Sequence, residues 1–143
     1  MPHLVILYTG QLDAETDMTL LCRGLAEAML SVKDEAGSPV FPTGGTRVLA
    51  YPAAHHAVAD AGVAGRAEGG TGDYAFVYLN LRMGRGRSAG VHKLTGETLL
   101  ACAKAHFEPV FTRRRIGITL QIDEGPEVFD AKHSNLHPLF NKS

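Results

Sequence analysis

The sequence predicts an α+β fold in which two β-α-β units are joined by a linker, and three observations support this prediction. Two stretches, residues 2–9 and 74–83, are short, apolar and rich in β-branched or aromatic residues, as is typical of strands. Each is followed by a segment whose apolar residues recur every three or four positions, like one face of a helix. A further strand pattern closes each unit, and equivalent elements lie about 70 residues apart, which indicates an internal duplication.

The first unit covers about residues 2–52. Its first strand is 2–9, and its helix begins after Asp17, a residue type that favours the N-cap position. A loop rich in glycine and proline then leads to the second strand, residues 46–51. The apolar face expected for the helix consists of Met18, Leu21, Leu25, Met29 and Val32.

The second unit covers about residues 73–123. Strand 74–83 shows the clearest alternation in the chain, the following helix starts near Ser88, and the last strand is 116–122. We expect Pro109 to kink or end this helix. The apolar face expected for it consists of Val91, Leu94, Thr98 and Ala101.

Residues 53–72, rich in alanine and glycine, form the predicted linker, with one short helical turn and a flexible joint at 69–72. The tail, residues 124–143, contains the apolar residues Leu136, Leu139 and Phe140, so we expect it to dock on the domain. The order β-α-β-β-α-β fits a ferredoxin-like sheet as well as two β-α-β units related by a twofold axis. In both cases one sheet face needs a cover, which points to oligomerisation.

Length and composition indicate one globular domain: 143 residues, 45% hydrophobic, 20% charged and a net charge of -1. This charge gives little support to nucleic acid as a partner. No signal peptide or apolar run of membrane-spanning length is seen, so the expected location is the cytoplasm. Cys22 and Cys102 fit buried small hydrophobic residues better than a disulfide or zinc site, and the seven histidines lack metal-site spacing, so no metal is predicted.

Four stretches together resemble one known family: MPH opening an apolar strand, FPTGGTR before the second strand, DYAFVYLNLRMGRGRS, and SNLHPLF near the end. From Pro2 to about Phe140 the chain resembles the 5-carboxymethyl-2-hydroxymuconate isomerase family of the tautomerase superfamily, with a linker that is longer than the family form. The resemblance implies a homotrimer of subunits with two fused β-α-β units. It also implies that Pro2, exposed after methionine removal, is the catalytic base and acid, that Arg47 and Arg87 bind substrate carboxylates, and that no cofactor is needed.

Physical chemistry agrees with these roles. A free α-amino group has a pKa of about 7.7 to 8.0, close to that of a general base working near neutral pH. If strands one and two run parallel and strand three antiparallel, Arg47 and Arg87 lie at the same sheet edge as Pro2. Arg85 adds a second cation beside Arg87. The alternative role for these arginines is that of surface cations or ion-pair partners. The GRGRS stretch could also form a phosphate-binding turn, but it lacks the lysine of the Walker motif. A retained Met1 would turn the proline nitrogen into an amide without basicity.

The predicted function is therefore that of a cofactor-independent isomerase that ketonises a dienol carboxylate such as 5-carboxymethyl-2-hydroxymuconate, in aromatic-compound (homoprotocatechuate) catabolism. The partners expected are a small carboxylate substrate and copies of the same chain, without nucleic acid or membrane. Two alternatives stay open. One is a tautomerase of another enol acid, such as phenylenolpyruvate, and the other is a non-catalytic trimer that binds a carboxylate or a protein.

Overall fold

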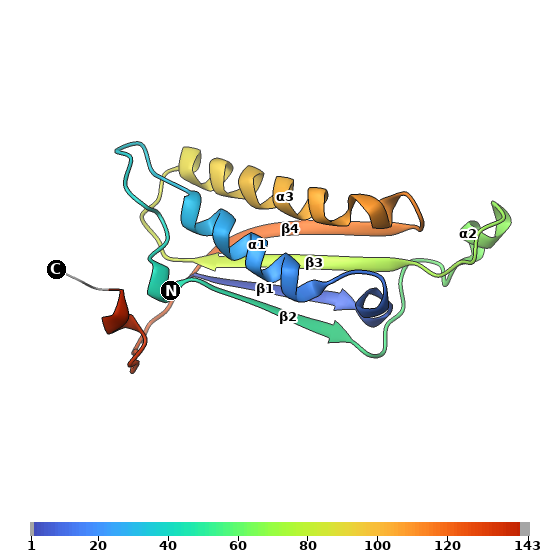
Figure 1. Cartoon of the computed structure of the whole chain (residues 1–143), viewed down its shortest axis with the longest axis horizontal. Coiled ribbons are helices and arrows are strands. Elements are labelled where there is room, and N and C mark those ends of the chain that lie inside the picture. Colours follow the sequence, from blue (N-terminus) through green and yellow to red (C-terminus); the bar gives the residue numbers. More distant parts are fainter. Residues whose placement is uncertain (1, 141–143) are drawn as a thin grey trace.

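Two helices lie side by side on one face of a four-stranded sheet (Figure 1). The structure is a computed structural model and describes residues 2–140. The strands are β1 (His3–Thr9), β2 (Arg47–Ala53), β3 (Ala75–Met83) and β4 (Ile116–Glu124), and the helices are α1 (Met18–Ser31), α2 (Val63–Ala67) and α3 (Ala89–Phe111). Short 3-10 turns are η1 (Gly10–Ala14), η2 (Thr43–Gly45) and η3 (His137–Leu139).

The sheet order is β2-β1-β3-β4, which confirms two fused β-α-β units. β1 pairs parallel with β2, β3 pairs parallel with β4, and the central strands β1 and β3 are antiparallel. In the ferredoxin-like alternative another strand would separate the two parallel strands of each unit. Here they are direct neighbours, so the twofold-related arrangement is the one that forms.

Both predicted helix starts are confirmed by capping bonds. The Asp17 side chain accepts a hydrogen bond from the Leu20 backbone N–H at 3.0 Å. Ser88 Oγ accepts one from the Val91 N–H at 3.2 Å. Each cap satisfies a backbone donor that the first helical turn leaves without an intrahelical partner. These two residues therefore fix where the long helices begin over the sheet.

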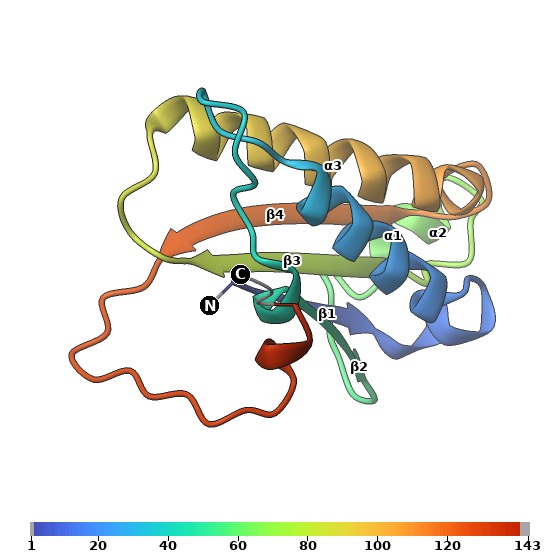
Figure 2. The same ribbon diagram turned by 60° about the vertical axis from the view of Figure 1, so that its left-hand side comes forward.

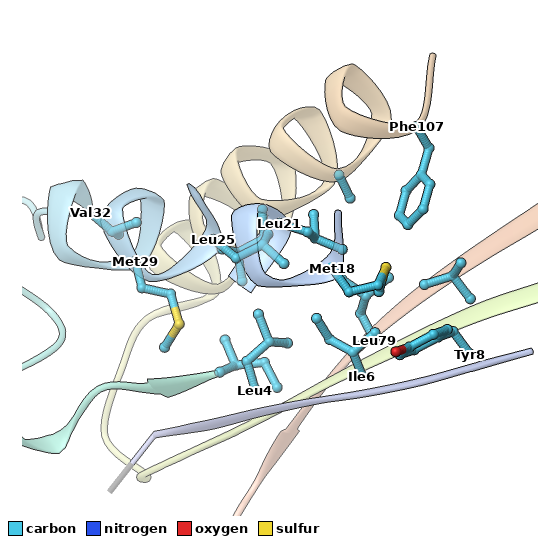
Figure 3. Close-up of a cluster of buried hydrophobic side chains, with 14 of the residues drawn as sticks. Leu4, Ile6, Tyr8, Met18, Leu21, Leu25, Met29, Val32, Leu79 and Phe107 are labelled. Atoms are coloured by element: carbon cyan, nitrogen blue, oxygen red, sulfur yellow. The ribbon is translucent and has the colours of Figure 1, made fainter. Parts of the chain in front are cut away.

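The core lies between the helices and one face of the sheet (Figure 3). Alternate residues of β1 point toward α1, and Phe107 of α3 closes the cluster, fully buried. The face predicted for α3 is wrong beyond Val91, since Leu94 is 45% exposed. The residues that α3 buries are Val91, Thr95, Leu99, Ala103, Phe107 and Val110. Apolar residues occur around much of this helix, so packing against the sheet rather than sequence periodicity decides which face is buried.

Pro109 does not end the helix directly, because α3 continues to Phe111. Pro109 is exposed and lies in the last turn, so its missing N–H removes a hydrogen bond only near the helix end. Cys22 and Cys102 are free and half-buried against the core, and burial raises the pKa of both thiols. The expectation of buried cysteines is therefore met only in part.

The opposite sheet face carries apolar residues that no helix in residues 2–140 covers (Figure 1). Leu7 of β1 and Leu49 and Tyr51 of β2 are 47%, 44% and 51% exposed. On the β3-β4 half this face is polar, and Tyr78 Oη donates a hydrogen bond to Gln121 Oε1 at 2.7 Å. We refer to this side as the open sheet face. Within the described residues no helix is both long and apolar enough to cross a bilayer.

Candidate functional site

Pro2 lies directly before β1 and lines a small pocket of about 160 Å³. Val40, Phe41 and Met83, each only 3% exposed, supply apolar walls. The full lining comprises Pro2, Val40, Phe41, Pro42, Met83, Gly84, Arg85 and Arg87. Pro2 itself is buried. We call this the Pro2 pocket.

Arg87 is held in the Pro2 pocket by the loop that follows α1. Its Nη2 donates a hydrogen bond to the Val40 backbone oxygen at 3.0 Å, and its Nη1 lies 4.0 Å from Asp34 Oδ2. Ser88 Oγ donates a hydrogen bond to Glu35 in the same loop. These contacts reduce the freedom of a long side chain, so the guanidinium is positioned before any ligand arrives.

Arg85 enters the same pocket from the turn after β3. Gly86, between the two arginines, has a φ of 100°, a conformation that favours glycine. An L-residue with a side chain would be strained there. The backbone of this turn thus favours glycine at residue 86, and the turn brings Arg85 and Arg87 to the walls of one cavity.

Arg47 lies at the predicted sheet edge but not in the Pro2 pocket. It pairs with His3 across the parallel β1-β2 ladder. Neighbouring residues of a strand point to opposite faces, so Arg47 and His3 share the open sheet face whereas Leu4 and Val48 point toward the core. Arg47 lines a second pocket of about 330 Å³ with the C-terminal tail.

The Pro2 pocket combines low polarity in its walls with two guanidinium groups. Burial and nearby positive charge both favour the neutral form of an amine, the form that accepts a proton. Guanidinium groups bind carboxylates through paired hydrogen bonds and stay charged at all ordinary pH values. The arrangement suits proton transfer on a small anionic molecule. Met1, whose removal would free the Pro2 nitrogen, lies outside the described residues.

His3 and His137 line the second pocket with Arg47, and the spacing of histidines along the sequence does not predict this. Among residues 2–140 no group of three or more potential metal ligands is found. The observed register of β1 and β2 sets His3 beside Arg47, and the parallel direction of the two strands does not by itself determine that register.

Comparison with known proteins identifies relatives along the whole chain. A family model described as "5-carboxymethyl-2-hydroxymuconate isomerase" matches residues 2–140. The chain is 26% identical over 140 residues to the 5-carboxymethyl-2-hydroxymuconate Delta-isomerase of Escherichia coli, a match that covers 98% of this chain and 99% of the relative.

Solved structures agree with this result. A crystal structure of a 5-carboxymethyl-2-hydroxymuconate delta-isomerase is 62% identical, with a TM-score of 0.98, and the match covers 100% of this chain and 95% of that one. A 5-carboxymethyl-2-hydroxymuconate isomerase from Deinococcus radiodurans R1 is 33% identical, with a TM-score of 0.80, over 99% of this chain and 95% of that one.

Proposed function

The chain belongs to the 5-carboxymethyl-2-hydroxymuconate isomerase family, and from this premise we propose that it ketonises a dienol di- or tricarboxylate of that type with the Pro2 amine as proton carrier. The observation that carries the proposal is the Pro2 pocket, in which Pro2 meets two arginines and apolar walls. The family names the reaction class, and the pocket supplies groups that fit it.

In the proposed reaction the neutral Pro2 amine takes the proton of the enol hydroxyl and a proton returns from the ammonium to a carbon of the conjugated chain. The O–H bond breaks, a C–H bond forms, and the double bonds shift to leave a ketone. Negative charge builds on the oxygen during this transfer, and a fixed cation nearby stabilises it. We assign this task to Arg87, whose guanidinium is held by its hydrogen bond to the Val40 carbonyl.

Arg85 reaches the same cavity from the glycine turn after β3 and makes no ion pair with another of residues 2–140, so its charge is available for a substrate carboxylate. Arg47 faces the other pocket, and we propose that it serves a substrate held by a neighbouring subunit. Its place on the open sheet face supports this, because the exposed Leu7, Leu49 and Tyr51 of that face suit burial between subunits of a homotrimer.

The test is the rate at which the protein consumes 5-carboxymethyl-2-hydroxymuconate, followed by ultraviolet absorbance, with an intact mass that confirms Pro2 as the first residue. The matched control is the same chain with one added N-terminal residue, which keeps every side chain but converts the Pro2 nitrogen into an amide. We expect the extension, like Pro2→Ala, to lower kcat by about 10²- to 10⁴-fold, the usual contribution of a general acid-base group.

Equal turnover by the extended chain would exclude Pro2 as the proton carrier. Turnover of a different enol acid with the same dependence on Pro2 would keep the mechanism and change the substrate. If neither is turned over and carboxylates still bind, the protein is the non-catalytic binding trimer of the alternative prediction.

A further inference from the structure

The loop between α1 and η2, residues 32–42, forms one side of the Pro2 pocket and contacts the turn that carries Arg87. Figure 2 shows it leaving the end of α1 near the start of α3 and running to η2, close to the N-terminus. Its last three residues, Val40, Phe41 and Pro42, line the pocket. We call this segment the α1 loop. Because the Val40 oxygen accepts the hydrogen bond from Arg87, the position of the guanidinium depends on how this loop folds.

Asp34 organises the α1 loop through one of its two carboxylate oxygens. Oδ1 accepts hydrogen bonds from the Ala36 N–H at 3.0 Å and from the Ser38 N–H at 2.9 Å. Aspartate side chains that accept bonds from backbone N–H groups shortly after them are typical of tight turns. Beyond the turn the Val40 N–H donates to the Val32 oxygen at 3.0 Å, which brings the chain back beside the end of α1. The turn at Asp34 therefore helps to set where the Val40 carbonyl lies.

The other carboxylate oxygen of Asp34 faces Arg87. Oδ2 lies 4.0 Å from Arg87 Nη1, and no other carboxylate of residues 2–140 lies within ion-pair distance of this arginine. The two side chains are 22% and 37% exposed, so water screens their attraction only in part. A separation of 4.0 Å is too long for a hydrogen bond. The carboxylate thus draws the guanidinium to one place and leaves the hydrogens of Nη1 free for a ligand.

Glu35 ties the same loop to the residue that follows Arg87. Ser88 Oγ donates a hydrogen bond to Glu35 Oε1 and, as the N-cap of α3, accepts one from the Val91 N–H. The bond from Ser88 lowers the pKa of the Glu35 carboxyl and so favours its charged form. The first turn of α3 has no acidic residue of its own, and Glu35 supplies the negative charge that a helix N-terminus favours. Asp34 and Glu35 therefore hold the Arg87 side chain and the adjacent backbone from one loop.

We propose that Asp34 is a positioning residue of the reaction. One of its oxygens folds the α1 loop so that the Val40 carbonyl meets Arg87, and the other orients the guanidinium in the Pro2 pocket. The effect on turnover rests on the proposed function, whereas the effect on the mobility of Arg87 does not. A fixed cation aimed at developing charge needs no reorganisation when the reaction occurs, so a looser Arg87 lowers kcat rather than raising KM.

The first measurement needs no substrate. In full-length protein with ¹⁵N-labelled arginine, a guanidinium whose rotation is hindered gives separate NMR signals for its two Nη groups, and Arg87→Ala assigns the Arg87 signals by their loss. We expect separate signals in the wild-type protein that merge in Asp34→Ala. Asp34→Asn keeps the oxygen that folds the turn and removes only the charge, so its signals should move toward merging to a smaller extent.

The matched control is Asp60→Ala. Asp60 accepts hydrogen bonds from the Gly62 N–H at 3.0 Å and from the Ala64 N–H at 2.9 Å, so it organises a similar turn. That turn precedes α2, at the end of the sheet away from η2 (Figure 1). The Arg87 signals should stay separate in this variant, and circular dichroism shows whether each variant is folded. Asp34→Asn serves as the test variant if Asp34→Ala does not fold.

The second measurement is a double-mutant cycle with 5-carboxymethyl-2-hydroxymuconate as substrate. Asp34→Ala should lower kcat by about tenfold with KM within about twofold, Asp34→Asn should lower it less, and Asp60→Ala should leave it unchanged. In an Arg87→Ala background Asp34→Ala should cause no further loss, because Asp34 acts through Arg87.

Three results would overturn the proposal: a full further loss in the Arg87→Ala background, Arg87 signals that stay separate in Asp34→Ala, or an Asp34→Asn protein with wild-type kcat and wild-type signals. A wild-type protein without turnover would contradict the proposed function instead, and the NMR measurement then decides the role of Asp34 alone.

Discussion

Arg114 offers the sharpest test of what holds the linker on the domain. Its side chain is only 10% exposed and makes three hydrogen bonds. Nε donates to Glu15 Oε1 at 3.0 Å, Nη1 donates to the Asp73 backbone oxygen at 2.9 Å, and Nη2 donates to the Asp73 carboxylate. One buried guanidinium thus joins the segment after η1, the end of the linker and the turn between α3 and β4.

Replacing Arg114 with Met keeps most of the aliphatic packing and removes all three bonds. Hydrogen bonds to charged groups contribute about 1.5 to 3 kcal/mol each, but Glu15 and Asp73 are partly exposed and recover hydration when the arginine is gone. We therefore expect the free energy of unfolding to fall by about 2 to 3 kcal/mol.

The assay is urea unfolding at one fixed protein concentration, since association between subunits makes the midpoint depend on concentration. With an m-value of about 2 kcal/mol/M, the midpoint should fall by roughly 1 to 1.5 M. Arg115→Met is the matched control, because the adjacent Arg115 also pairs with a carboxylate, Glu68, but is 74% exposed. Exposed pairs contribute about 0 to 1 kcal/mol. Equal midpoints for the two variants would refute the reasoning.

Two further predictions concern the tyrosine buried under α1 and the open sheet face. Burial, aided by a hydrogen bond to Asp13 at 2.6 Å, raises the pKa of Tyr8 to about 12. Between pH 10 and 12 the folded protein therefore binds more protons than the unfolded chain, and its free energy of unfolding falls as the pH rises. Tyr8→Phe should reduce this fall when urea unfolding is measured against pH, and an unchanged slope would contradict the prediction. Leu49→Glu should dissociate the proposed trimer in sedimentation velocity, whereas Leu20→Glu, at an exposed position of α1, should not; a Leu49→Glu protein that stays associated would argue against the open sheet face as the contact.

Much of the fold was predictable because local signals and packing agree. Alternation along residues 75–83 gives β3, and Asp17 and Ser88 mark helix starts through bonds that depend on nearby residues alone. The buried face of α3 was not predictable, because Leu94 and Leu99 are equally apolar and only the sheet beneath the helix distinguishes them. The strand order likewise depends on contacts between distant segments, so the sequence left it open.

The candidate site shows the same division between local and distant causes. The sequence places Pro2, Arg47 and Arg87 at one edge, and the strand pairing agrees. The face of the sheet on which each residue lies depends on the strand register and on where the tail docks. No sequence motif predicts the register or the docking position. The Val40 carbonyl that holds Arg87 and the tail that meets His3 both come from loops far along the chain.

The two pockets meet at a single peptide link, because Pro2 lines one and His3 lines the other. Successive residues of a strand point to opposite faces, so this separation follows directly from the start of β1 at His3. The second pocket lies on the open sheet face, where we propose that a neighbouring subunit completes its walls. Substitution of His3 is therefore expected to change the second pocket directly and the position of Pro2 through the peptide bond that joins the two residues.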